Sequence, residues 1–198
     1  MTLGIVIVLL LLSTVTNCGQ IHQKVRLRTL SAREYYPHAL EKAQQWKPDA
    51  YLDRIRVDVL SEENFTRRLG MSFGFQSPND DHHSLLIFFR EDSDEPEVEI
   101  VYQEIPISVH NPINSEDWPV DSLKALAIAQ GNGGDEFLAK HDPKTALMTL
   151  YLERLPKVPG ARLQWRASFW DLATSEKVRI MLDPRTGEVI EVDRQPSR

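Results

Sequence analysis

The chain has 198 residues, of which 41% are hydrophobic and 26% charged, a composition typical of a folded protein with one domain or two small ones. This balance excludes a chain that is disordered throughout. The formal net charge is −6, and the lysines and arginines are scattered, so a nucleic-acid partner is not expected.

The N-terminal segment differs from the rest of the chain. Leu3–Val15 is apolar apart from Ser13 and Thr14 and carries no charge. As a helix it covers about 20 Å, short of the ~30 Å hydrocarbon core of a bilayer. That length is typical of a secretory signal, so we expect a signal peptide over residues 1–17. A short, uncleaved membrane anchor is the alternative.

Cys18 is the single cysteine of the chain and directly follows this segment. Residues 15–18 (Val-Thr-Asn-Cys) resemble the cleavage box of bacterial lipoproteins, in which the cysteine becomes the acylated first residue. Asn17 departs from the Gly, Ala or Ser usual before the cysteine, and no Lys or Arg precedes the apolar segment. The resemblance implies lipidation at Cys18 and a tether over residues 18–30. An intramolecular disulfide is excluded, and a catalytic role for Cys18 is not expected.

A first helix is predicted after the tether. Ser31 and Glu34 fit a capping box, whereas Pro37 is the alternative first helical position. The apolar stripe of this helix consists of Tyr36, Ala39, Leu40, Ala43 and Trp46. Strands are expected over residues 51–60, 69–76, 84–90 and 98–105, because apolar and polar residues alternate there and turn-rich segments separate them.

The same order returns in the second half. Asp121 or Ser122 begins a predicted helix, and the glycines at 131–134 loosen or end it. Its apolar stripe is Leu123, Leu126, Ala127 and Phe137. Strands are expected over residues 146–155, 162–170, 177–182 and 188–193, and residues 183–187 (Asp-Pro-Arg-Thr-Gly) form the last hairpin turn.

The two halves therefore predict an internal duplication, with units over residues 31–105 and 119–194 and a linker over 106–118. Ala39, Leu40 and Ala43 recur as Ala125, Leu126 and Ala129. One helix followed by consecutive strands favours antiparallel pairing. The expected fold class is α+β, made of two repeated units that each pack one helix on an antiparallel sheet.

The second half resembles the PepSY-like domains of bacterial envelope proteins and protease propeptides. The resemblance is carried by residues 121–129 (DSLKALAIA), by the strand at Trp165 and by residues 180–189 (IMLDPRTGEV). The first half resembles a diverged copy, with residues 91–97 in place of the terminal hairpin. The resemblance implies a cystatin-like fold and an extracytoplasmic, non-enzymatic role, which for some members is modulation of peptidases. It brings no catalytic residues.

Candidate chemistry is sparse. Residues 79–83 (Asn-Asp-Asp-His-His) are the only cluster of metal-ligand types, but adjacent residues of an extended segment point in opposite directions. The acidic residues at 91–99 lack the glycine of a calcium loop. We therefore expect no catalytic residue, metal or cofactor. A small metal-dependent hydrolase built on His82 and His83 is the remote alternative.

Two function classes follow from these features. The favoured one is a non-catalytic, membrane-tethered, extracytoplasmic binding or modulatory protein that acts on a peptidase or another envelope protein through its sheet edges or its helix-free face. The alternative is a structural or assembly lipoprotein with a permanent protein partner. The sequence identifies no binding residues, although Trp170 should lie on the strand face opposite Trp165 and Phe169 and is the best candidate for an exposed contact.

Overall fold

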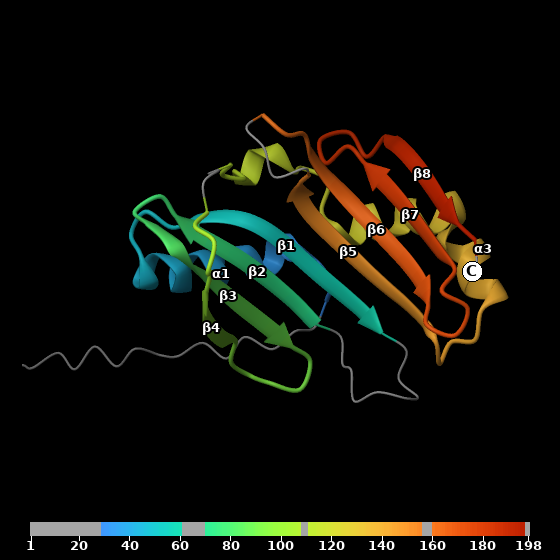
Figure 1. The fold of residues 1–198 in the computed structure, drawn as a ribbon, viewed down its shortest axis with the longest axis horizontal. Coiled ribbons are helices and arrows are strands. Elements are labelled where there is room, and N and C mark those ends of the chain that lie inside the picture. The colour runs from blue at the N-terminus through green and yellow to red at the C-terminus, as the bar shows by residue number, and fades with distance from the viewer. Residues whose placement is uncertain (1–28, 61–69, 108–110, 156–159, 197–198) are drawn as a thin grey trace, which may run out of the picture.

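The alternating segments form one eight-stranded antiparallel sheet among residues 29–60, 70–107, 111–155 and 160–196, which are the residues that the computed structural model describes (Figure 1). In chain order the strands are β1 (Tyr51–Leu60), β2 (Gly70–Ser77), β3 (Asp80–Arg90), β4 (Glu97–Tyr102), β5 (Ala146–Arg154), β6 (Leu163–Asp171), β7 (Lys177–Leu182) and β8 (Val189–Gln195).

The strand order is β4-β3-β2-β1-β5-β6-β7-β8, so β1 and β5 form the centre and β4 and β8 the edges. The central pair is antiparallel, with Val57 opposite Leu150 and Ile55 opposite Leu152. The α+β class and the antiparallel pairing are confirmed. The strands of the two predicted units do not form separate sheets, because β1 and β5 join them into one.

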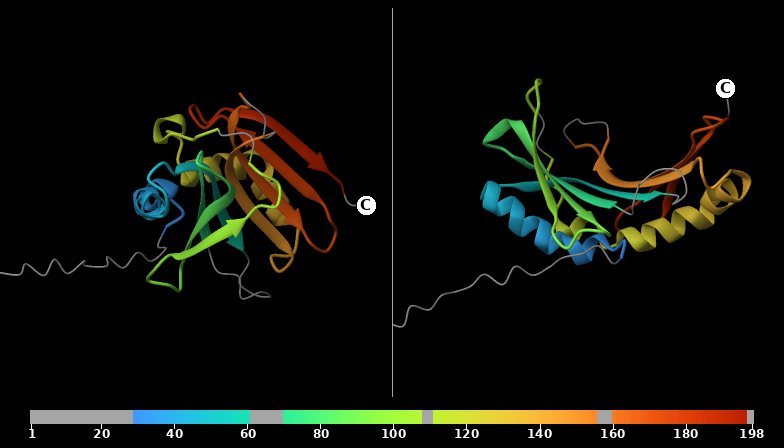
Figure 2. Two further views of the ribbon diagram at one scale, coloured as in Figure 1. Left: turned by 60° about the vertical axis from the view of Figure 1, so that its left-hand side comes forward. Right: turned by 90° about the horizontal axis from the view of Figure 1, so that it is seen from below.

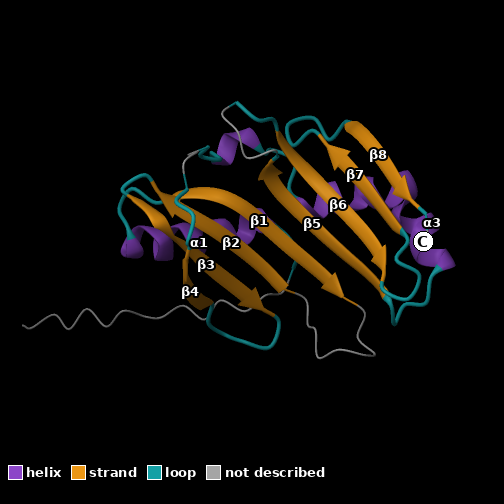
Figure 3. Ribbon diagram, viewed as in Figure 1, coloured by secondary structure: helices purple, strands orange, loops and turns teal. Residues whose placement is uncertain are grey.

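Two helical segments lie on the same face of this sheet (Figure 3). Helix α1 (Ala32–Trp46) packs on β1, β2 and β3, and helix α2 (Ser122–Ala129) packs on β6 and β7. The core between helices and sheet includes Tyr35, Phe73 and Trp165, each at most 2% exposed. This face of the sheet is thus covered, whereas the other carries no helix among the described residues.

The start of α1 differs from the prediction. The helix begins at Ala32, Pro37 lies inside it, and the Ser31 side chain makes no capping hydrogen bond. The carboxylate of Asp121 instead accepts a hydrogen bond from the Arg33 N–H at 3.1 Å. A carboxylate at a helix N-terminus satisfies an otherwise unpaired donor and favours the dipole. The cap is therefore supplied by a residue 88 positions away, which no local pattern could reveal.

The second helical segment is kinked where the glycines were expected to loosen it. A π-helical turn, η2 (Gln130–Gly134), links α2 to α3 (Asp135–Lys140), and Gly133 has a φ of +125°. A short 3₁₀ turn, η1 (Ser115–Asp117), precedes α2. The kink lets both α2 and α3 place residues against the sheet, with Phe137 buried and its ring 6.3 Å from that of Phe169.

The predicted stripe is correct for Leu126 and Phe137, which are buried, and wrong for Leu123, which is 45% exposed. Ala127 is also exposed. The reason lies in Ser122, whose hydroxyl accepts a hydrogen bond from the Ala32 N–H at 2.7 Å and donates one to the Leu30 carbonyl. These bonds fix the rotation of α2. The small residues Ala125 and Ala129 then face the sheet, and Leu123 points away from it.

Candidate functional site

The helix-free face of the sheet is concave. Viewed along the sheet, the helices follow the convex side and the outer strands rise on either side of β1 and β5 (Figure 2, right). Residues on this face alternate with the buried residues of the same strands: Arg56 lies between Ile55 and Val57, and Tyr151 between Leu150 and Leu152. The polar residues that alternate with the buried ones on neighbouring strands therefore share one surface of the sheet.

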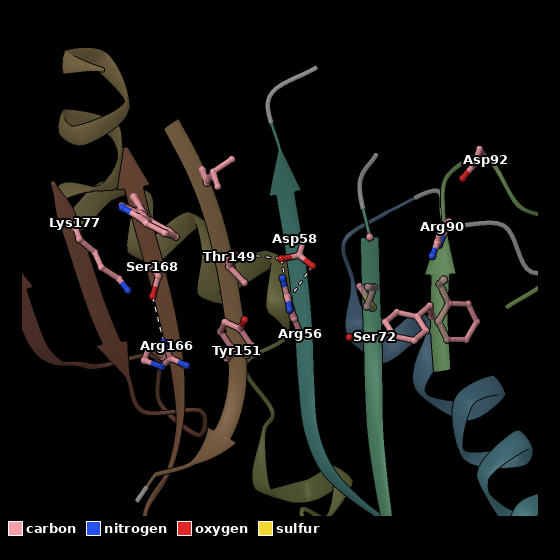
Figure 4. A pocket seen from close by; sticks show the side chains of 16 residues that line it. Arg56, Asp58, Ser72, Arg90, Asp92, Thr149, Tyr151, Arg166, Ser168 and Lys177 are labelled. Atoms are coloured by element: carbon pink, nitrogen blue, oxygen red, sulfur yellow. Dashed lines mark hydrogen bonds and ion pairs between the residues drawn. The ribbon is translucent and has the colours of Figure 1, made fainter. Parts of the chain in front are cut away.

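A groove of about 870 Å³ occupies this surface and spans β3 to β7. Its floor and walls combine cationic side chains, hydroxyls and aromatic rings that come from six strands (Figure 4). The cationic lining residues are Arg56, Arg90, Arg166 and Lys177. Asp58 and Asp92 also line the groove, so its lining has four positive and two negative side chains. The chain as a whole carries a net charge of −6, so this surface has the opposite charge balance to the molecule around it.

The centre of the groove is a row of directly paired residues. Ser72 lies opposite Arg56, Arg56 opposite Tyr151, and Tyr151 opposite Arg166. The Tyr151 ring is flanked by both guanidinium groups, with the Arg56 Cζ 5.5 Å and the Arg166 Cζ 4.6 Å from its centroid. Cation–π contacts of this kind hold two long side chains in defined positions.

Two ion pairs hold the same guanidinium groups on their other side. The Arg56 Nε donates to Asp58 at 3.0 Å, and Arg166 pairs with Glu153, whose side chain is only 10% exposed. Arg166 also donates to the Ser168 hydroxyl at 3.4 Å. Each guanidinium nitrogen of Arg166 thereby donates one hydrogen bond, whereas the terminal nitrogens of Arg56 bond to no described residue.

The β7 end of the groove is different, because its cation, Lys177, lies next to the aromatic ring of Trp170 instead of a carboxylate. The Lys177 Nζ lies 5.8 Å from the ring centroid of Trp170, which is directly opposite on β6 and 43% exposed. Leu147 on β5 lies opposite Trp170 on its other side. Burial lowers the pKa of Lys177, and the positive charges of Arg179 and Arg166 lower it further. Among the described residues Lys177 forms no ion pair.

Of the residues that the sequence analysis singled out, Trp170 alone lies in the groove. Trp165 and Phe169 are fully buried on the opposite face of β6, as predicted. Arg56, Tyr151, Arg166 and Lys177 were not identified from the sequence, although a strand was predicted over residues 51–60, in which apolar and polar residues alternate. Their convergence depends on strand register.

The histidines and Cys18 lie elsewhere. His83 Nδ1 lies 2.8 Å from Asp80, and His82 Nδ1 lies 3.0 Å from the Gln103 carbonyl, while both rings contact Tyr102. In the described ranges, no three His, Cys, Asp or Glu residues gather to hold a metal ion. Cys18, the predicted lipidation site, lies outside the described residues. No helix within the described parts is long and apolar enough to cross a bilayer.

Comparison with known proteins adds one structural likeness. A crystal structure of a "putative lipoprotein" from Clostridium difficile 630 matches with a TM-score of 0.48 and 13% identity, over 89% of this chain and 97% of that one. No protein-family model matches the sequence. No curated protein matches it either.

Proposed function

We propose that the protein is a non-catalytic binding module that holds a segment of another polypeptide in the groove of its helix-free face. The observation that carries this proposal is the groove itself, about 870 Å³ in volume and lined by preoriented arginines, hydroxyls and exposed aromatic surface. Binding sites combine apolar surface with a few precisely placed polar groups. The described lining contains no histidine or cysteine, and Asp58 is engaged by Arg56.

A polypeptide suits this surface better than an acyl chain does. Ser72, Thr149 and Ser168 line the floor between the charged side chains. An acyl chain laid over them would bury hydroxyls and charges without partners, which is costly. A polypeptide supplies backbone N–H and C=O groups that can bond to them. The ligand of the groove is therefore expected to be an exposed segment of another protein, such as a peptidase or another envelope protein.

The proposed setting is the extracytoplasmic face of a bacterial membrane, with the chain tethered through lipid on Cys18. It rests on the apolar segment of residues 3–15 and the cysteine that follows it. Mass spectrometry of the native protein should find an acylated N-terminal peptide that starts at Cys18. An intact N-terminus with a free thiol at Cys18 would contradict the lipid tether and support an uncleaved anchor.

We further infer that the two halves are copies of one PepSY-like unit. In support, each half contains four consecutive antiparallel strands that run outward from the centre, β1 to β4 and β5 to β8, and each has helical residues on the same face. Superposition of residues 32–102 on 122–195 should align helix with helix and each strand with its counterpart. Strands that do not align would contradict the duplication, and the shared order of elements would then be a coincidence.

Binding can be tested with a library of random nonapeptides selected on the purified domain. Selected peptides should lose affinity for Tyr151→Ala and Trp170→Ala variants, which alter the groove. They should keep affinity for Leu123→Ala and Lys124→Ala variants, which alter exposed residues on the opposite side. The proposed function fails when no peptide is enriched, or when the groove variants bind the enriched peptides as tightly as the wild type.

A further inference from the structure

The cations of the groove are not equivalent in what they can still bind. Arg166 is committed to Glu153, and Arg90 to Glu97 at 2.6 Å. Lys177 pairs with no described carboxylate. Arg56 pairs with Asp58 through its Nε, but its terminal nitrogens bond to no described residue. Two positive groups, one on β1 and one on β7, are therefore held on the groove floor with donors available for an anion.

The surroundings of the groove have the opposite sign. On the same face of the sheet, the edge strand β4 presents Glu97 and Glu99, and the edge strand β8 presents Glu191 and Asp193. Of these four carboxylates, Glu97 pairs with Arg90 and Asp193 pairs with Arg179. A long polyanion that extended past the groove would meet these carboxylates at both edges. A ligand that carries negative charge only at the floor avoids this repulsion. This charge distribution disfavours a nucleic-acid strand and favours isolated carboxylates.

On these grounds, and on the basis of the proposed function, we propose that the groove selects acidic polypeptide segments, with one carboxylate on Lys177 and a second on Arg56. The side chain next to the first carboxylate packs on Trp170, which lies opposite Lys177 on β6, and on Leu147, which lies opposite Trp170 on β5. The positive end of the groove thus recognises an acidic residue flanked by an apolar one.

The sheet fixes the spacing of the two carboxylates. Arg56 and Lys177 lie on strands β1 and β7, which are three strand intervals apart. At about 4.8 Å per interval this is about 14 Å across the strands. The pairing register places Met181 in the row of Arg56, and Lys177 lies four residues away along β7, which adds about 13 Å along the strands. The two positions are therefore about 19 Å apart, or roughly six residues of an extended chain at ~3.3 Å each. The segment should therefore carry acidic residues about six positions apart.

The test uses nonapeptides recovered by selection on the wild-type domain, resynthesised with each Asp or Glu changed to Asn or Gln. The acidic peptides should bind at least about fivefold more tightly than their amide counterparts, and raising the salt concentration should reduce that difference. Lys177→Gln should weaken the acidic peptides about threefold to tenfold and leave the amide peptides unchanged. Lys124→Gln, the same change on the helix side, should affect neither.

Three other results of the peptide experiment would contradict the proposal in different ways. Groove-dependent peptides that bind equally well as acids and as amides would overturn the acidic selectivity while leaving the proposed binding function intact. The absence of groove-dependent peptides would overturn both. Vesicles of phosphatidylglycerol that bind the wild type, displace the peptides and lose affinity with Lys177→Gln would assign the cations to a lipid surface instead of a polypeptide.

Discussion

At the scale of single residues, Leu126 and Leu123 provide a matched pair on α2. Leu126 is 8% exposed and Leu123 is 45% exposed. Leu126→Ala should lower the free energy of unfolding by about 2–4 kcal/mol, because it removes buried methyl groups and leaves a cavity. Leu123→Ala should cost less than about 1 kcal/mol. Urea unfolding of both variants measures the difference, and equal midpoints would mean that the rotation of α2 is wrong.

Asp171 gives a pH-dependent prediction. Burial would raise the pKa of this carboxyl, but hydrogen bonds from the Thr145 and Thr174 side chains and from backbone N–H groups lower it to about 2. An unfolded Asp has a pKa near 3.9. Because the folded pKa is the lower one, the stabilisation is fully present above about pH 4 and is lost as the pH falls towards 2.

Asp171→Asn removes this titration. Acid unfolding curves of the wild type should steepen between about pH 4 and pH 2, and the variant should lose that part of the pH dependence while being less stable at pH 7. Asp142→Asn is a suitable control, since Asp142 is an exposed aspartate whose side chain accepts a hydrogen bond from the Lys144 N–H. Parallel stability curves for Asp171→Asn and wild type would show that the carboxylate is not held as described.

At the scale of elements, two glycines of η2 differ in how closely other residues pack against them. A Cβ on Gly134 would lie 2.3 Å from Cζ of Phe169, whereas a Cβ on Gly131 would meet nothing within 4 Å. Gly134→Ala should therefore destabilise the protein by about 1–3 kcal/mol through overpacking. Gly131→Ala should be neutral or stabilise it by up to about 1 kcal/mol. Thermal melts of the two variants compare them, and equal melting temperatures would contradict close packing of the kink against β6.

The elements also show what the sequence could and could not predict. Strand patterns were informative because alternation has a period of two, and the expected 177–182 strand agrees with β7. The kink was predictable because three glycines lie within residues 131–134. The cap of α1 by Asp121 and the rotation of α2 by Ser122 were not, since both depend on contacts about 90 residues apart. Trp170 was identified because a strand face can be read locally.

The groove itself belongs to the whole molecule. Its central row joins Arg56 and Tyr151, which come from the two halves of the chain and meet because β1 pairs with β5. No local pattern specifies that pairing, since either edge of a half could have met the other half. The predicted units were therefore informative about the order of elements, whereas the binding surface arises from the way the halves are joined. A separated half would lack one side of the groove.

The pairing of β1 with β5 also predicts how the molecule unfolds. Six residue pairs join β1 to β5, and the Ala32 N–H to Ser122 Oγ bond joins the helices. Since Leu150 is fully buried opposite Val57, Leu150→Ala should cost about 2–5 kcal/mol and destabilise both halves together. Amide hydrogen exchange should show the same loss of protection in β3 and in β7, although Leu150 lies on neither strand.

Leu147→Ala is the matched control, because Leu147 lies on the same strand but on the groove face and is only partly buried. It should reduce protection by less than Leu150→Ala does, and equally in both halves. Independent folding units would behave differently: Leu150→Ala would then lower protection in β5 to β8 and leave β3 at its wild-type value. That result would mean that the β1–β5 pairing does not couple the halves, and that the groove between them is not held rigidly by one cooperative sheet.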